Sequence, residues 1–108
     1  MSDTKLLKFV KSFRHGLGVR GDGRFECFAI CAPLVTLLNM EGWQGQLKTG
    51  NVKFDLGECN HYWIELEDGR VLDPTAAQFN ERLGLDLPRV YLGPPTKIHV
   101  TQQIRTET

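Results

Sequence analysis

The sequence lacks an excess of charge of one sign, a long apolar run and any internal repeat. Its 108 residues carry 13 Lys and Arg against 13 Asp and Glu, so the formal net charge is zero. Without a long-range field, we expect no nucleic-acid partner and no membrane-surface partner. No apolar run approaches the roughly 20 residues of a bilayer span, and the first residues do not resemble a secretory signal. We therefore expect one cytoplasmic domain over residues 1–108.

Cysteine is scarce as well. Cys27, Cys31 and Cys59 are an odd number without a secretory signal, which argues against a disulfide framework. The remaining uses are buried free thiols, a reactive thiol or ligands to a metal ion. The sequence is silent on the oligomeric state, and it predicts no cofactor.

The first segment with a helical pattern starts at Asp3 or Thr4 and ends near Gly16. Apolar residues recur along it at helical spacing, and the basic residues between them are expected to form a solvated face: Lys5, Lys8, Lys11 and Arg14. A Gly-rich turn over residues 16–23 should follow this amphipathic helix.

The second segment is an apolar run over residues 25–40, which Gly42 ends and which is long enough for a buried helix. Pro33 lies inside this run. A proline either kinks a helix or occupies its first turn, so the helix starts near Cys27 in the first case and near Ala32 in the second.

The remainder of the chain predicts strands. We expect them at residues 43–48, 52–56, 61–66, 70–73 and 89–92, with a turn at 50–51 and a further strand at Ile98 and Val100. The order of two helices followed by antiparallel strands indicates an α+β fold. The strongest signal is the hairpin formed by residues 61–73, because Gly69 supplies the positive φ that a short loop needs.

A thiol, an imidazole and a carboxylate occur in an order that suits nucleophilic catalysis. Cys27 lies where the buried helix should begin, and a helix N-terminus favours a thiolate. If residues 67–69 form a three-residue loop, Leu66 pairs with Arg70 and Trp63 with Asp73. His61 and Asp73 then share a face as diagonal neighbours, and the carboxylate can orient the imidazole. A two-residue turn would instead send Asp73 to the other face.

These motifs resemble the transglutaminase-like branch of the papain-fold cysteine proteins. The resemblance runs over residues 23–79 and is based on Cys27-Phe-Ala-Ile with a Gly at 42, His61-Tyr-Trp-Ile-Glu and Asp68-Gly69-Arg-Val-Leu-Asp73-Pro-Thr-Ala. It implies N-terminal helices packed on an antiparallel sheet and thiol chemistry on a peptide or protein amide. Cys27 would be the nucleophile, His61 the general base and acid, and Asp73 the residue that orients His61. The activity would be that of a cysteine peptidase, amidase, deamidase or acyl transferase working through a thioacyl intermediate.

Several alternatives stay open. Cys31 would replace Cys27 as the nucleophile if the helix started at Ala32, and a catalytically silent interaction module of the same fold would use neither thiol. A third possibility is a zinc site formed by Cys27, Cys31, Cys59 and His61, although their spacing matches no common motif. The backbone N–H of Cys27 is the expected first oxyanion donor, with Gln44, Gln46 and Asn60 as candidates for the second. His15 and His99 show no partner in the sequence.

Overall fold

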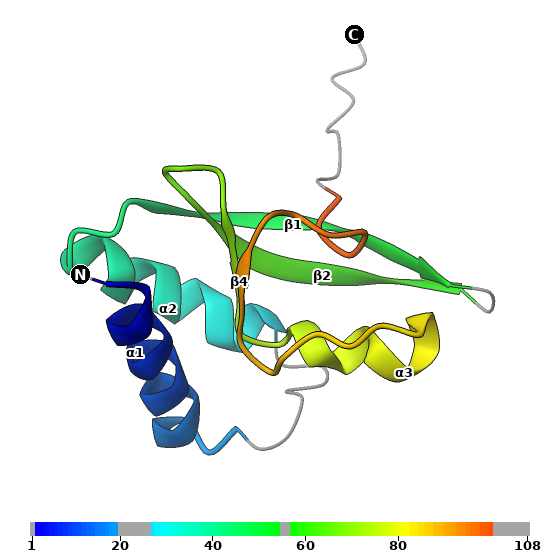
Figure 1. Ribbon diagram of the computed structural model, residues 1–108, viewed down its shortest axis with the longest axis horizontal. Coiled ribbons are helices and arrows are strands. Elements are labelled where there is room, and N and C mark those ends of the chain that lie inside the picture. The colour runs from blue at the N-terminus through cyan, green and yellow to red at the C-terminus, as the bar shows by residue number, and fades with distance from the viewer. Residues whose placement is uncertain (1, 20–26, 55–56, 101–108) are drawn as a thin grey trace, which may run out of the picture.

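The computed structural model describes residues 2–19, 27–54 and 57–100 (Figure 1). Its elements are α1 (Asp3–Gly16), α2 (Cys27–Met40), β1 (Gly45–Phe54), β2 (Gly57–Leu66), β3 (Val71–Asp73), the 3₁₀ helix η1 (Ala76–Phe79), α3 (Asn80–Leu83) and β4 (Tyr91–Gly93). Most of the predicted turn at 16–23, the start of the second apolar run at 25–26 and the end of the predicted strand at 52–56 lie outside the described residues.

The four strands form one antiparallel sheet in the order β1-β2-β3-β4. With its helices, this sheet confirms the predicted α+β class. The expected turn at residues 50–51 is wrong, because β1 runs without a break and pairs with β2 from Gly45 to Phe54. The glycine at 50 has a different purpose. A Cβ atom there would lie 1.8 Å from the carbonyl oxygen of Val100, so only glycine lets the two backbones meet.

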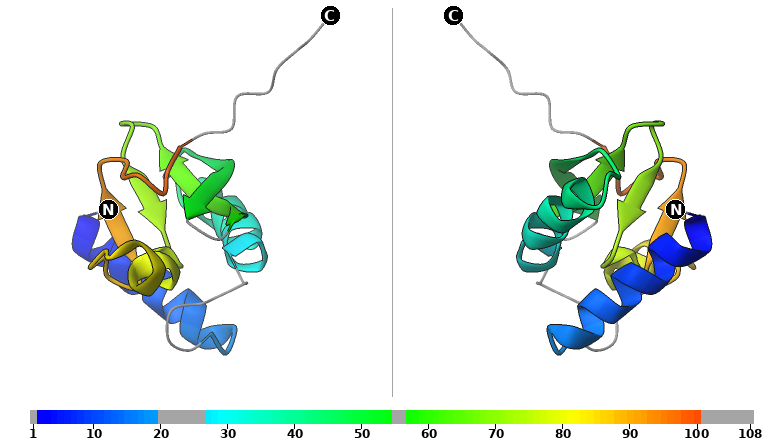
Figure 2. Two further views of the ribbon diagram at one scale, coloured as in Figure 1. Left: turned by 90° about the vertical axis from the view of Figure 1, so that its right-hand side faces the viewer. Right: turned by 90° about the vertical axis from the view of Figure 1, so that its left-hand side faces the viewer.

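Helices α1 and α2 cover one face of the sheet (Figures 1 and 2). The apolar residues of α1 recur every three to four positions, and Leu6 and Val10 are fully buried against α2 and the sheet. The even-numbered residues of β2 point toward the helices because side chains alternate along a strand. This alternation places Ile64 and Leu66 in the larger core cluster.

The other face is covered by η1, α3 and the irregular segment that follows β4. Val52, Ala76, Phe79 and Ile98 form its core. Ile98 and Val100 do not form the expected strand, because residues 96–100 are turn and coil, and Ile98 packs into this core. The odd-numbered residues of β2 point toward this face, and of these His61 and Trp63 are buried.

The hairpin between β2 and β3 has the predicted register. Ile64 pairs with Leu72, and the amide of Leu66 donates to the carbonyl of Arg70 at 2.9 Å. Gly69 has the expected positive φ of 87°. The three-residue loop is therefore confirmed, and continuing the register by one step puts Asp73 opposite Trp63 and on the face of His61.

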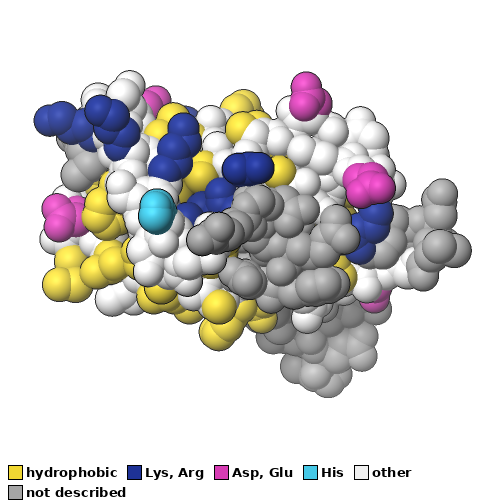
Figure 3. All heavy atoms as spheres, turned by 90° about the horizontal axis from the view of Figure 1, so that it is seen from below, with side chains coloured by type: hydrophobic (Ala, Val, Ile, Leu, Met, Phe, Trp, Pro, Cys, Tyr) yellow, Lys and Arg dark blue, Asp and Glu magenta, His cyan; other side chains and the backbone are white. Residues whose placement is uncertain are grey.

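Helix α1 follows its prediction closely, although Ser2 rather than Asp3 or Thr4 is its N-cap. Lys5, Lys8 and Lys11 are exposed, as expected for a solvated face, but Arg14 is buried. Figure 3 shows basic and apolar side chains side by side on the face of the molecule seen from below. Within the described part of the chain, no helix has the length and hydropathy needed to cross a bilayer.

Candidate active site

Cys27 is the first residue of α2, and Pro33 lies within that helix. The alternative in which Pro33 occupies the first turn of a helix starting at Ala32 is therefore wrong. One missing amide donor is tolerated because Ile30, Cys31, Leu34 and Leu38 bury the helix against the sheet. The Cys27 thiol is free and half-buried, at the end of the helix where the helix dipole favours a negative charge.

His61 and Asp73 meet across the β2–β3 hairpin. The Nε2 atom of His61 lies 2.5 Å from Oδ2 of Asp73, and both side chains are fully buried. The contact depends on the hairpin register, because a shift by one residue would move Asp73 to the opposite face. His61 lies within β2 rather than at its start, since this strand begins at Gly57.

The other oxygen of Asp73 is also occupied. Oδ1 accepts a hydrogen bond from the amide of Thr75 at 3.0 Å and a longer one from its hydroxyl at 3.4 Å. The amide group of Gln78 donates to the same hydroxyl at 2.9 Å, which leaves the hydroxyl proton for Asp73. The carboxylate is thus fixed by the residues that follow it, as the turn chemistry of Asp-Pro-Thr suggests.

His99 is a member of this cluster that the sequence did not reveal. Its Nε2 atom lies 2.7 Å from Oδ2 of Asp73, and its side chain is fully buried. The backbone amide of Thr96 donates to Nδ1 of His99 at 3.1 Å, so this nitrogen is an acceptor and Nε2 carries the proton. His99 therefore donates to Asp73 as a neutral imidazole. No short-range sequence pattern could predict a contact between residues 26 positions apart.

The two charges of the cluster stabilise each other. Burial acts to raise the pKa of Asp73, but the charge and hydrogen bond of His61, with the hydrogen bond from His99, lower it to about 2. Burial acts to lower the pKa of His61, but the negative charge of Asp73 and the hydrogen bond to it raise it to about 9. At neutral pH the pair is an imidazolium and a carboxylate.

The thiol of Cys27 lies beside this imidazole. Burial acts to raise its pKa, but the interactions with the His61 side chain and with the backbone amide of Tyr62 outweigh that effect and lower it. Nδ1 of His61 is buried and has no hydrogen-bond partner of good geometry among the described residues. Within the described residues the link between the thiol and the ring is therefore the effect of His61 on the pKa of Cys27.

Because β3 ends at Asp73, the carbonyl and amide groups of Tyr62 can interact with the thiols of α2. Continuing the hairpin register places Pro74 opposite Tyr62, and proline has no amide proton to donate. The carbonyl of Tyr62 accepts instead from the thiol of Cys31 at 3.6 Å, and its amide lowers the pKa of Cys27. Tyr62 also packs its ring edge-on against Phe28, with centroids 5.0 Å apart.

The thiols of the other two cysteines have raised rather than lowered pKa values. Burial raises the pKa of Cys31 well above its ordinary value, and it also raises the pKa of Cys59. Cys31 is fully buried in the core between α2 and the sheet. Of the three thiols, Cys27 alone has a lowered pKa.

Aromatic rings enclose the imidazole of His61. Phe79 meets it edge-on with centroids 4.9 Å apart, and Trp63 lies at 5.6 Å. Both are buried, as expected for aromatic side chains that pack in the core rather than bind ligands. An environment this dry strengthens the attraction between His61 and Asp73.

The cluster of His61, Asp73 and His99 also has the residue types of a metal site, with ligand atoms within 4.8 Å of one another. The hydrogen bonds argue against that use. Nε2 of His99 carries a proton because Nδ1 accepts from a backbone amide, so this nitrogen has no lone pair for a metal ion. The four zinc ligands considered from the sequence, Cys27, Cys31, Cys59 and His61, do not form such a group in the described part of the chain.

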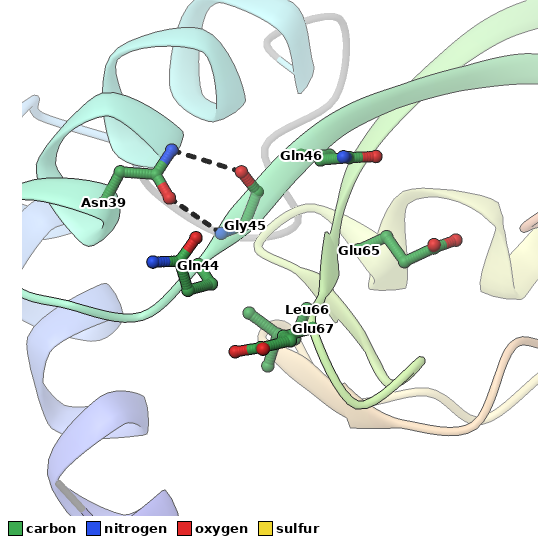
Figure 4. A pocket seen from close by; sticks show the side chains of 7 residues that line it. All are labelled: Asn39, Gln44, Gly45, Gln46, Glu65, Leu66 and Glu67. Carbon is green, nitrogen blue, oxygen red and sulfur yellow. Dashed lines mark hydrogen bonds between the residues drawn. The ribbon is translucent and has the colours of Figure 1, made fainter.

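Gln44 and Gln46, two of the candidates for the second oxyanion donor, lie away from His61. Gln44 and Gln46 line a groove with Asn39 and Glu65 (Figure 4). Gln46 pairs with Glu65, four residues from His61 along β2, which is roughly 13 Å in a strand. Asn60 neighbours His61 and is exposed. The amide of Tyr62, which sequence reasoning did not consider, is a backbone group that lowers the pKa of the Cys27 thiol.

Comparisons with protein-family models, with characterised proteins and with solved structures found no match for this chain.

Proposed function

We propose that the protein is a papain-like, transglutaminase-like cysteine enzyme that acts on amide bonds through Cys27, His61 and Asp73. The observation that carries this proposal is the arrangement around His61. Asp73 occupies Nε2, which leaves the buried Nδ1 as the proton-exchanging atom beside a thiol of lowered pKa. A thiolate paired with an imidazolium is the activated form of a cysteine nucleophile.

The reaction would proceed in two halves. The sulfur of Cys27 attacks the carbonyl carbon of a peptide or side-chain amide, and the C=O π electrons move onto oxygen. Collapse of this tetrahedral species breaks the C–N bond, and the leaving amine takes a proton from Nδ1 of His61. Water or a second amine then attacks the thioester, gives its proton to His61 and releases the thiolate. The choice between water and amine separates a hydrolase from an acyl transferase.

Backbone donors would stabilise the negative oxygen. The amide of Cys27 is at the start of α2, where helix N–H groups have no partner within the helix. The amide of Tyr62 lies on the edge of β2 that β3 leaves free. Together, these two backbone amides would supply the donors of an oxyanion hole.

The test is alkylation by iodoacetamide at pH 6, with each labelled cysteine identified by mass spectrometry. An ordinary thiol with a pKa of about 8.5 is almost wholly protonated at this pH and labels slowly. We expect fast labelling of Cys27, with Cys31 and Cys59 in the same molecule as slow internal controls. Cys27→Ala should also abolish hydrolysis or transamidation of a glutamine-containing peptide library, whereas Cys59→Ala should retain it. Slow labelling of all three thiols would overturn the proposal in favour of a catalytically silent interaction module.

A further inference from the structure

His99 reaches the cluster from a segment without regular structure, so something must hold that segment in place. After β4, residues 96–100 cross β1 at Gly50, which pairs with His61 in the sheet. The backbone of Val100 comes so close to Gly50 that an added Cβ would lie 1.8 Å from its carbonyl oxygen. This close approach, together with the burial of Ile98, fixes the position of His99.

The contacts of His99 define its orientation and its protonation state. The amide and the hydroxyl of Thr96 both meet Nδ1, at 3.1 Å and 2.9 Å. The ring stacks on Tyr91 with centroids 5.7 Å apart and meets Trp63 edge-on at 5.3 Å. The two aromatic rings and Thr96 together fix the orientation of the imidazole. In this orientation the Nε2 proton points at Oδ2 of Asp73.

We propose that His99 is a positioning residue of the active site, a second and permanently oriented donor that fixes the carboxylate oxygen on which His61 depends. This inference rests on the proposed function of Cys27 and His61. Oδ2 accepts from both imidazoles while Oδ1 accepts from Thr75, so every lone pair of the buried carboxylate has a donor. The carboxylate cannot rotate without breaking several of these bonds.

Two consequences follow for the chemistry. A buried carboxylate that loses a donor is less stable as an anion, so it becomes protonated at a higher pH. A carboxylate that can rotate also holds the His61 ring less firmly, so Nδ1 is less often directed at the thiol of Cys27. Among the described residues, the titratable groups in contact with His99 are His61, Asp73 and Tyr91.

The experiment compares four variants. His99→Leu removes the donor, whereas His99→Gln retains an N–H group at a similar distance from the backbone. Gly50→Ala keeps His99 but forces the backbone of Val100 away from β1. His15→Leu is the matched control, because His15 is exposed on α1. Far-UV circular dichroism and thermal melting establish that each variant is folded at the assay temperature.

The first readout is the pH profile of Cys27 alkylation. We expect His99→Leu to lower the rate at pH 6 at least tenfold and to move the acid limb to higher pH. Gly50→Ala should reproduce both changes, and His99→Gln and His15→Leu should stay within threefold of the wild-type rate. A folded His99→Leu protein with the wild-type profile would overturn the inference and leave the proposed function intact.

The second readout does not depend on the reactivity of the thiol. The Nε2 proton of His61, hydrogen-bonded to Asp73, should give a downfield resonance in ¹⁵N-edited NMR spectra of the wild type and His99→Gln. It should broaden by exchange in His99→Leu and Gly50→Ala. If wild-type Cys27 labels slowly but this resonance shows the expected pattern, the positioning role stands and the proposed function fails. A sharp resonance in all variants would contradict the positioning role itself.

Discussion

Nε2 of His61 and Oδ2 of Asp73 lie 2.5 Å apart at the point where β3 ends. The contact joins two residues 12 positions apart, and it exists because Gly69 closes a three-residue loop that brings them onto one face. The same end of β3 leaves the edge of β2 open at Tyr62, whose backbone amide lowers the pKa of the Cys27 thiol. One hairpin therefore positions the imidazole, its carboxylate partner and the backbone of Tyr62.

The charge pair predicts that stability decreases in alkaline solution. The pKa of His61 is about 9 in the folded protein against 6.5 for an ordinary histidine. A group with a raised folded pKa contributes stability that is complete below pH 6.5 and is lost as the pH rises through 9. We expect the free energy of unfolding, measured with urea, to fall by on the order of 3 kcal/mol over this window.

The control for that experiment is His61→Gln, which can donate to Asp73 but does not titrate. Its stability should be lower than that of the wild type at pH 6 and nearly constant up to pH 9. A wild-type protein whose free energy of unfolding is also constant over this range would contradict the imidazolium–carboxylate pair.

Gly69 supports a prediction about the loop. Its φ of 87° lies in the left-handed region, and an added Cβ would meet nothing within 4 Å, so any cost of substitution comes from the backbone alone. Gly69→Val should cost at least 1–2 kcal/mol, roughly the penalty of a left-handed residue, with more for the β-branch. Gly69→Asn should cost clearly less because asparagine tolerates this conformation. Thermal denaturation measures both, and equal losses would refute the backbone explanation.

The hairpin shows how much a local pattern can specify. Alternation along residues 61–66 and one glycine at the loop were sufficient to predict the register and the meeting of His61 with Asp73. The start of α2 at Cys27 was likewise predictable from the continuous apolar run, although Phe28 within that run is exposed. These features depend on contacts close in sequence.

The features that the sequence did not predict depend on contacts between residues far apart in the chain. Gly50 has the local appearance of a turn residue, but its function is to let Val100 approach β1. His99 has no neighbouring partner in the sequence, yet it shares Asp73 with His61 through a segment without regular structure. In each case the decisive partner comes from a chain segment whose path no propensity or periodicity encodes.

The hydrogen-bonded cluster predicts a protein without a structural zinc ion. His99 donates its Nε2 proton to Asp73, and a proton on this nitrogen excludes a metal ion there. We expect elemental analysis of the purified protein to find zinc well below one atom per chain, and incubation with EDTA to leave the melting temperature unchanged. One zinc atom per chain, released together with unfolding, would favour a metal centre over the proposed catalysis.

The last prediction separates the two cysteines of α2, which lie four residues apart on one helix. Cys31 is fully buried, its thiol donates to the carbonyl of Tyr62, and burial raises its pKa well above the ordinary value. Cys27 is half-buried beside His61 and has a lowered pKa. Cys31→Ala should therefore cost about 1–2 kcal/mol, since it removes one sulfur atom from the core and one weak hydrogen bond.

The same Cys31→Ala variant should keep fast labelling of Cys27 at pH 6, whereas Cys27→Ala should lose that labelling with little change in stability. Urea denaturation and alkylation rates on the two variants measure both effects. The reverse result, with fast labelling lost in Cys31→Ala and retained in Cys27→Ala, would move the nucleophile to Cys31. That outcome would require the buried thiolate to be stabilised by a rearrangement of α2, because its environment here favours the protonated thiol.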